Sequence, residues 1–592
     1  MAGVTFAKEL SMKASRPNPV CLLLLFWISA GAQNFVFTSG NPKYDLPFAD
    51  AKANIAFNTK GTPPNTVFHA GAFWDQVWTR DGSYSIEMAC GHIDPQTSRN
   101  TFNYTTTTIS PYGTVQLQDV CGHFGGWPNL TDGIVWATGA WAFYRETGDT
   151  NFLKYAYPII RASLVRAETE VRDPADSLFK GCASFMESNS GYPIAFANNK
   201  TQTGYSVGNS KAGSTNMLHY HAYIVADSMA KLLKKPQSTL DTLSQKALML
   251  KTAINNNMWN SAKGYYYYLK YATGFKLDRN EGLADAFAIL YDIADSARKA
   301  SILANTKPSA WGYVCQYPQD SSWLSYLANP AAPTADYYHS NKIWPFVCGY
   351  IAWAGTKMKN QDVFMNNMDK VAQIWKKGVT APEIGEFREF YLTESGNPGL
   401  NGGGQQLWSA SGYISMVFHG LFGMNFDVDG VRFDPMVPDT FKNAMTLNNF
   451  IYRGMTLNMT VQGPGKYLVD FKLDGLSKPD HFIPGTLTGT HTVSMTLSNT
   501  PVGTLPGTIN VSLVNRGIPV CSNTMQGVSF RFGSYQKVNV SLYSLAGRSV
   551  GEFTTLNGIV TVSKKDYQPG TYIIKWHSEN VHGVQKVLLQ GR

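Results

Sequence analysis

The chain has 592 residues, more than one hydrophobic core usually supports, so its length predicts two or more domains. Hydrophobic residues make up 44% and charged residues 15%, which is typical of a globular protein. The net charge of +9 lies mostly at the two ends: residues 1–32 carry three basic residues and one acid, and residues 521–592 carry eight and three. The remaining chain is nearly neutral, which argues against nucleic acid or a polyanion as a partner.

The first 32 residues have the pattern of a secretory signal peptide. Lys8, Lys13 and Arg16 precede the apolar run VCLLLLFWISA, and AGA before Gln33 supplies the small residues of a cleavage site. The apolar run is shorter than the roughly twenty residues of a membrane span. We therefore expect no anchor, and a protein that is secreted or held at the outer cell surface.

Cysteine spacing gives little sign of a metal site. Six cysteines follow the signal peptide, and none forms a CxxC pair: Cys90, Cys121, Cys182, Cys315, Cys348 and Cys521. This scatter argues against zinc and leaves any disulfide pairing open. We expect no cofactor and no bound metal, and most of these thiols to be buried and free.

From residue 33 to 69 the chain is a lead-in, and from 70 to 425 helical patterns alternate with loops rich in Gly, Pro, Asn and aromatic residues. Five helices are predicted from apolar spacing and boundary residues, at residues 131–149, 214–233, 280–293, 341–355 and 405–423. They are apolar over much of their circumference, which predicts burial. This length holds roughly a dozen helices, as a closed double ring of six hairpins requires.

After residue 425 the pattern changes to short alternating strands. Residues 426–500 are predicted to form a β-sandwich, residues 501–520 a Pro-, Gly- and Thr-rich linker, and residues 521–592 a second, basic β-sandwich. The stretches VSLYSLAGRSV, QPGTYIIKW and GVQKVLLQ of the last region resemble the C-terminal sorting domain of the Bacteroidetes type IX secretion system. The resemblance implies that this domain contacts the secretion machinery; the alternative is an ordinary accessory module.

Four stretches of the helical region stand out together: VWTRDGSYSI, GCASFMESNSGYP, DYYHSNKIWPF and QQLWSASGY. In this order they resemble elements of the six-hairpin, or (α/α)6-barrel, glycoside hydrolases, especially glycogen-debranching and processing α-glucosidases. The resemblance implies a mainly α fold, an (α/α)6 toroid followed by small β-sandwiches. It also implies sugar-binding roles for Trp78, Arg80, Asp81, Trp127, His339, Trp344 and Trp408. The alternatives are a structural ion pair at Arg80 and Asp81 and core packing for the tryptophans.

Cleaving a glycosidic bond needs one carboxylic acid and one carboxylate on opposite faces of the bond. Glu187 matches the segment that carries the family's general acid, although the family usually has Asp there. For the base, APEIGEFREFYLTESG offers Glu383, Glu386, Glu389 and Glu394. Of these, EFYLTESG matches the family pattern with Glu389, nineteen residues before Trp408. Glu383, in APEIG, is the second choice.

The sequence thus predicts a secreted, inverting exo-glycosidase, monomeric, that acts on α-glucosides or related oligosaccharides. Two alternatives stay open. One is a polysaccharide lyase that uses Tyr338 and His339 as acid and base, and the other is a carbohydrate-binding protein with an inactive barrel. The sugar itself is not predicted, because one fold serves many substrates.

Overall fold

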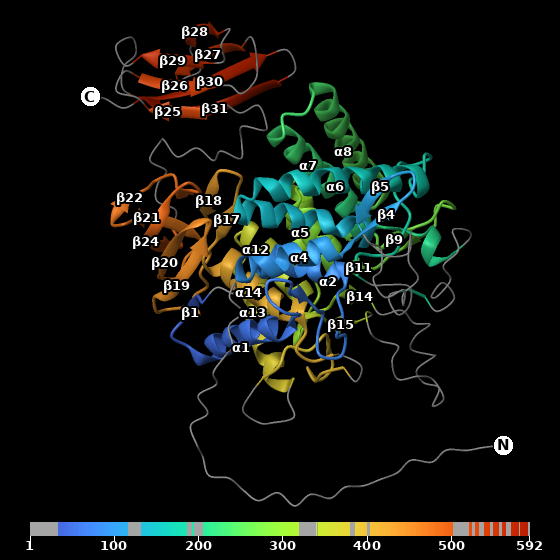
Figure 1. The fold of residues 1–592 in the computed structure, drawn as a ribbon. Coiled ribbons are helices and arrows are strands. Elements are labelled where there is room, and N and C mark those ends of the chain that lie inside the picture. The colour runs from blue at the N-terminus through green and yellow to red at the C-terminus, as the bar shows by residue number, and fades with distance from the viewer. Residues whose placement is uncertain are drawn as a thin grey trace, which may run out of the picture.

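A computed structural model describes residues 34–116, 132–185, 192–193, 205–318, 339, 341–378, 385–399 and 403–500, and the strands named below from residue 520 onward. Helices form the centre of the molecule, and strands from the C-terminal part of the chain lie beside them (Figure 1). The expectation of a helical region followed by β regions is confirmed. No helix of the described residues has the length and hydrophobicity of a membrane span.

Six helices follow one another in a continuous series of contacts. They are α2 (Thr79–Ser85), α5 (Asp132–Thr147), α7 (Gly213–Leu232), α9 (Gly282–Leu290), α12 (Pro345–Lys357) and α14 (Leu407–Ser415). Each contacts the next, and α14 contacts α2. Two π-helical segments, η1 (Ile86–Cys90) and η3 (Met416–Leu421), extend the first and the last of them. Most residues of this set are buried, as the apolar patterns predicted.

A second set of helices packs on the first. It comprises α1 (Pro42–Asn58), α4 (Pro95–Tyr104), α6 (Thr150–Glu170), α8 (Gln237–Asn257), α10 (Ser296–Asn305) and α13 (Gln361–Lys377). Each contacts at least one helix of the first series. Side chains cap several of these helices. Asp149 accepts hydrogen bonds from two amides at the start of α6, and Asn41 accepts one at the start of α1, where Pro42 is the first helical residue.

Short strands precede several helices of the first series. β6 (Lys211–Ala212) leads into α7, β11 (Asn280–Glu281) into α9 and β15 (Lys342–Ile343) into α12. β6 pairs with β9 (Leu269–Lys270), β11 with β14 (Gln316–Tyr317) and β15 with β16 (Tyr391–Leu392). β9 also pairs with β10 (Lys276–Leu277). Backbone pairing therefore ties the chain at the amino ends of these helices to loops from elsewhere in the sequence.

The remaining small elements of the helical region connect these parts. They are β2 (Thr59–Lys60), β3 (Val67–Phe68), α3 (Gly91–Ile93), β4 (Thr106–Ile109), β5 (Gly113–Gln116), η2 (Val207–Asn209), β7 (Trp259–Asn260), β8 (Tyr265–Tyr266), β12 (Pro308–Ser309) and β13 (Gly312–Tyr313). Most form two-stranded antiparallel pairs.

The first β region contains two sheets. One has the order β1 (Val36–Thr38), β19 (Met445–Tyr452), β20 (Gly454–Gln462), β24 (Thr488–Ser498), β21 (Tyr467–Leu473) and β22 (Leu476–Ser477). The other joins β17 (Met424–Phe426), β18 (Gly430–Phe433) and β23 (Phe482–Pro484). Burial alternates along β20, so one face of the sheet packs inward. Through β1, the lead-in of the chain is part of this sheet.

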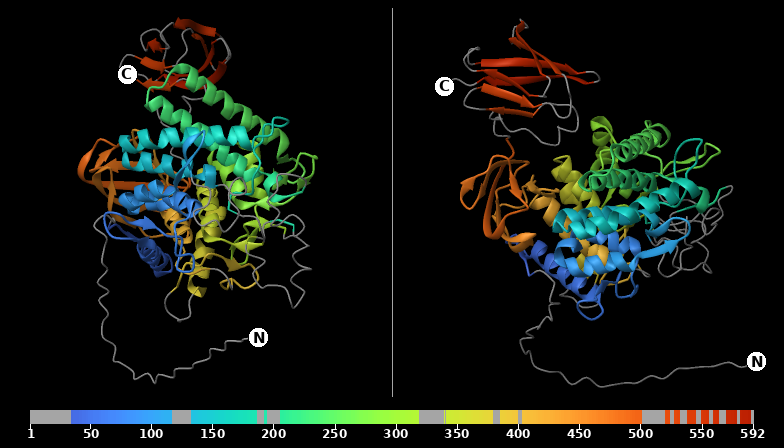
Figure 2. Two further views of the ribbon diagram at one scale, coloured as in Figure 1. Left: turned by 45° about the vertical axis from the view of Figure 1, so that its right-hand side comes forward. Right: turned by 45° about the horizontal axis from the view of Figure 1, so that its top comes forward.

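The C-terminal strands have a hydrophobic core of their own. They are β25 (Val520–Asn523), β26 (Gly527–Arg531), β27 (Val538–Ser544), β28 (Ser549–Thr555), β29 (Ile559–Ser563), β30 (Gly570–Ser578) and β31 (Val581–Leu589), in two sheets. Their buried residues, such as Phe530, Val540 and Ile574, form a cluster separate from the main core. Both views of Figure 2 show these strands grouped apart from the first β region.

Candidate active site

The amino ends of α2, α12 and α14 bring together the residues that the sequence motifs indicated. Trp78, Trp344 and Gln406 each stand directly before the first residue of one of these helices. Arg80 and Asp81 lie in the first turn of α2, and both side chains are buried. Because α14 contacts both α2 and α12, residues more than 300 positions apart in sequence meet at one place.

The carboxylate of Glu389 is held against the tryptophan-rich stretch that precedes α2. The indole N–H of Trp74 donates to Oε2 of Glu389 at 3.0 Å, and the amide of Gly403 approaches the same oxygen at 3.4 Å. The Glu389 amide donates to the Gly403 carbonyl at 2.8 Å. Glu389 is only 4% exposed, so these donors replace much of the water that a carboxylate otherwise requires.

Gln406, the residue before α14, also contacts Asp81 of α2. Nε2 of Gln406 lies 3.5 Å from Oδ1 of Asp81, so α14 contacts the acid of the Arg-Asp pair directly. Burial, together with the nearby Arg80 charge, lowers the pKa of His339 well below its ordinary value. The imidazole of His339 is therefore neutral beside a fixed positive charge.

Aromatic rings form the wall of the candidate site. Trp344 stacks on His339 at 5.1 Å between ring centres and on Phe390 at 5.6 Å. Trp408 stacks on Phe346 at 4.3 Å. Phe185 meets these rings edge to face, contacting His339, Trp344, Phe346 and Trp408. Trp344, Phe346, Phe185 and Trp408 are each at most 3% exposed, so these rings pack mainly on one another.

The indole N–H of Trp408 is buried and has no hydrogen-bond partner in the described part of the protein. Burying a donor without an acceptor costs on the order of 1–3 kcal/mol. The same is true of other buried side-chain atoms of the described residues, such as Asn367 Oδ1, so this atom by itself does not mark a ligand.

The described structure brings seven of the ten predicted site residues into one cluster: Trp78, Arg80, Asp81, His339, Trp344, Trp408 and Glu389. The other three predicted residues, Glu187, Trp127 and Glu383, lie outside the described residues, as does Tyr338.

The two neighbouring glutamates differ from Glu389. Glu386 forms an ion pair with Arg388 at 3.0 Å, and burial raises its pKa above the ordinary value. Glu394 accepts a hydrogen bond from the hydroxyl of Thr393 at an exposed position. The Glu386 carboxylate lies against Gly404 and accepts a hydrogen bond from the Gln405 backbone, so it borders the loop that also holds Glu389.

Sequence reasoning missed a further buried carboxylate, Glu281 of β11. Burial raises its pKa to about 7, and its Oε1 accepts a hydrogen bond from the hydroxyl of Ser184 at 3.2 Å. Ser184 lies three positions before Glu187 in the sequence. In the sequence, Glu281 stands directly before the strongly apolar helix α9. That helix was predicted from its apolar residues, and the carboxylate was given no role.

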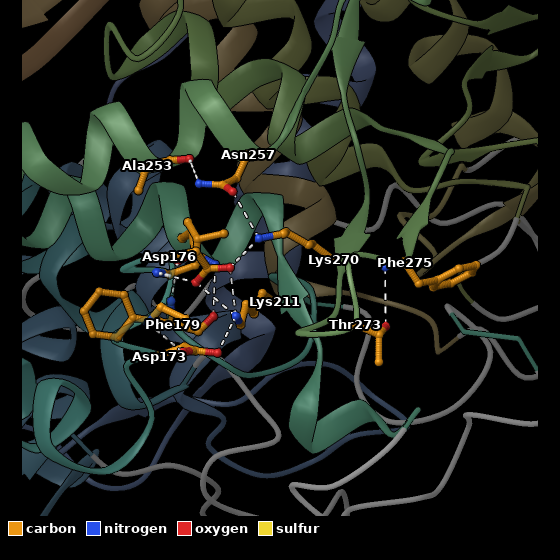
Figure 3. A network of polar contacts seen from close by, with 12 residues as sticks. Asp173, Asp176, Phe179, Lys211, Ala253, Asn257, Lys270, Thr273 and Phe275 are labelled. Carbon is orange, nitrogen blue, oxygen red and sulfur yellow. Dashed lines mark hydrogen bonds and ion pairs between the residues drawn. The ribbon is translucent and has the colours of Figure 1, made fainter.

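A buried ion-pair network holds residues 173–176, which precede Ser184 in the sequence (Figure 3). The ammonium of Lys211, in β6, contacts Asp173 at 2.6 Å and Asp176 at 2.8 Å, and Lys270 of β9 also contacts Asp176. Although burial alone would raise it, the lysine partners hold the pKa of Asp176 below its ordinary value. The network fixes residues 173–176 to two strands, and with them the chain that leads to Ser184.

Groups of three or more His, Cys, Asp and Glu side chains with the spacing of a metal site are absent from the described residues. In the described part of the chain, Cys90, Cys182, Cys315 and Cys348 are buried and form no disulfide.

No protein-family model and no curated protein sequence matches the chain. Among solved structures it is similar to a GH78 family rhamnosidase of Bacillus sp. GL1, at 13% identity and a TM-score of 0.53 over 80% of this chain and 43% of the other. It is also similar to a sialidase, at 12% identity and a TM-score of 0.55 over 72% and 39%. A GH63 mannosylglycerate hydrolase from Thermus thermophilus is 13% identical, with a TM-score of 0.47 over 62% of this chain and 99% of the other.

The chain thus spans about two fifths of the length of the rhamnosidase and of the sialidase. At such low identity the similarity shows a shared fold and nothing of substrate. The protein has a fold that glycoside hydrolases use.

Proposed function

We propose that the protein is a glycoside hydrolase, and that its two series of helices form an (α/α)6 toroid with the active site at the amino ends of the inner series. The contact of α14 with α2, which returns the series to its start, supports the toroid. The observation that carries the function is the buried Glu389 carboxylate, oriented by Trp74, whose ring meets that of Trp78 two residues before Arg80.

In the proposed reaction two carboxyl groups act on opposite faces of the scissile bond. Glu187 protonates the leaving oxygen, and Glu389 removes a proton from the attacking water, which inverts the anomeric carbon. Arg80 and Asp81 hold hydroxyls of the sugar whose bond is cleaved, since a fixed guanidinium and carboxylate offer several strong hydrogen bonds. Trp344 and Trp408 border the same sugar from the aromatic cluster behind Arg80 and Asp81. We propose exo-action on α-glucosides or related oligosaccharides.

The decisive experiment is an oligosaccharide screen with NMR detection of the anomer first released. A single inverted anomer is expected for the cleaved sugar. Release of an unsaturated product that absorbs in the ultraviolet would instead favour the lyase, in which the neutral His339 acts as a base.

On a cleaved substrate, Glu389→Gln and Glu187→Gln should each lower kcat by about a thousandfold or more, because proton transfer is lost. Glu394→Gln is the matched control, since it lies in the same stretch outside the cluster. Circular dichroism checks that the variants fold. Full activity of both active-site variants would exclude these assignments.

We also propose that the protein is secreted after removal of residues 1–32, that residues 501–520 are a linker, and that residues 521–592 serve export. The basic C-terminal strands with their separate core are compatible with a module of this kind. Fractionation of cells that express the chain with and without residues 521–592 tests it.

A further inference from the structure

Ser184 is held by three separate elements of the helical region. Its amide donates to Oγ of Ser214 in α7 at 3.0 Å, and the hydroxyl of Tyr84 in α2 donates to its carbonyl at 3.3 Å. Its own hydroxyl donates to Oε1 of Glu281 in β11 at 3.2 Å. All four residues are buried. Ser184 is therefore fixed from α2, from α7 and from the strand that leads into α9.

Glu281 is the residue that joins these contacts. Besides the Ser184 hydroxyl, it accepts hydrogen bonds from the backbone and the side chain of Ser214. Its own backbone is fixed, because it pairs with Gln316 of β14 and because α9 begins at the next residue, Gly282. One carboxyl group thus connects the starts of α7 and α9 to the segment that contains Ser184.

The residue after Ser184 links this junction to the candidate site. Phe185 is buried, and its ring meets those of His339, Trp344 and Trp408 edge to face. Glu187 follows two positions later in the sequence. A shift of Ser184 would therefore displace a ring of the site and the start of the segment that carries the proposed acid. Displacements of about 1 Å in an active site can cost about a hundredfold in rate.

We propose that Glu281 is a positioning residue for hydrolysis, which holds Ser184, and through it Phe185 and the start of the segment that carries Glu187, where the reaction requires them. This inference rests on the proposed function. Glu281 itself does not touch the substrate in this role. Its loss should therefore lower kcat more than it raises KM, because Arg80 and Asp81 stay in place to bind the sugar.

The test is a double-mutant cycle of Glu281→Leu and Ser184→Ala, with kcat measured at pH 6 on the substrate found by the oligosaccharide screen. Each single change should lower kcat about tenfold, because the segment loses an anchor. The double variant should lose less than the product of the two single losses, by about threefold or more, because both changes break the same hydrogen bond.

Glu281→Gln should rescue the activity that Glu281→Leu loses. Oε2 of Glu281 is buried without a hydrogen-bond partner among the described residues, and burial raises the pKa of the carboxyl to about 7. At pH 6 most of it is therefore protonated, and a neutral amide that still accepts from Ser184 resembles it. We expect kcat of this variant within about threefold of the wild type.

Asp285→Asn is the matched control. Asp285 is a buried carboxyl four positions after Glu281, and it accepts a hydrogen bond from Asn280 at 2.6 Å instead of from Ser184. Its kcat should match that of the wild type. Unchanged kcat in Glu281→Leu, or losses that simply multiply in the double variant, would overturn the role of Glu281 while leaving hydrolysis established. If Glu281→Leu does not fold, Ser184→Ala alone decides: a tenfold loss supports the role, and wild-type kcat overturns it.

A wild-type protein that cleaves nothing in the screen would exclude the proposed function instead. Hydrogen exchange measured by mass spectrometry then decides on Glu281. The amides of residues 181–185 should exchange about tenfold faster in Glu281→Leu than in the wild type, because their segment opens more often. In Asp285→Asn they should exchange at the wild-type rate. Equal exchange in Glu281→Leu and the wild type would show that Glu281 does not hold this segment.

Discussion

At the scale of single residues, the stretch from Gly71 to Asp81 places rings and charges together because each depends on the other. Arg80 and Asp81 are buried, and the indole of Trp74 supplies the hydrogen bond that a buried Glu389 needs. A carboxylate without such donors would lose much of its charge on burial. The tryptophan is therefore both an apolar wall and a polar partner.

Replacing Trp74 with Phe removes that N–H donor and keeps an aromatic ring. Because a hydrogen bond to a charged group is worth about 1.5–3 kcal/mol, kcat should fall about tenfold or more. The acidic limb of the pH–rate profile should move to higher pH, since the ionised carboxylate loses a donor. The measurement is kcat against pH for both enzymes.

Trp141→Phe on α5 is the control for loss of an indole, because Trp141 packs against Tyr144 outside the site. A Trp74→Phe enzyme whose pH profile coincides with that of the wild type would show that Trp74 does not position the base.

At the scale of elements, sequence patterns predicted the buried helices within a few residues. The helix expected at 131–149 is α5 (Asp132–Thr147), and that at 214–233 is α7 (Gly213–Leu232). The helix expected at 341–355 starts only at Pro345, because Lys342 pairs with Leu392 in a short strand. Such a pairing joins residues fifty positions apart, and periodicity within one stretch does not detect it.

In the candidate site, too, local sequence predicted some features, and long-range contacts determine the others. Motifs indicated Arg80, Asp81 and Trp408, which lie beside helix starts where local sequence is informative. The bond from Trp74 to Glu389 and the burial of Glu281 depend on how distant helices meet, and no local pattern carries them. No local pattern predicts the pairing of Val36 with Asn448 either.

The start of α9 should make stability depend on pH. Burial raises the pKa of Glu281 to about 7 and that of Asp285 to about 8, although Ser184, Ser214 and Asn280 donate hydrogen bonds to them. A carboxyl whose pKa is raised on folding stabilises the fold while it is protonated. This stabilisation is complete below about pH 4 and is lost as pH rises through about 7 and 8.

The melting temperature of the wild-type protein should therefore carry a falling component between about pH 5 and pH 8. In Glu281→Gln this component should shrink, because the amide does not titrate. Differential scanning fluorimetry across this range measures it, with Glu394→Gln as a control at an exposed carboxylate. A pH dependence in Glu281→Gln equal to that of the wild type would contradict the assignment.

In the whole molecule, the main hydrophobic core joins segments that are far apart in the sequence, and the C-terminal strands have a separate core. Phe35 and Phe37, at the start of the described chain, are buried in the main core. Phe35 contacts Phe48 of α1, Phe418 of η3 and Phe450 of β19. The lead-in thereby joins the helices to the first β region. The cluster around Phe530 and Val540, by contrast, shares no member with that core.

This division predicts opposite effects at the two ends of the chain. A protein that ends at residue 500 should keep its melting temperature within about two degrees, because the main core is untouched, and any activity should be unchanged. Phe35→Ala should lower the melting temperature by several degrees, since truncating a buried Phe costs about 3–5 kcal/mol. Scanning calorimetry of both variants beside the full chain provides the measurement. If removal of residues 501–592 destabilises the helical region as much as Phe35→Ala does, the two cores are coupled and fold as one unit.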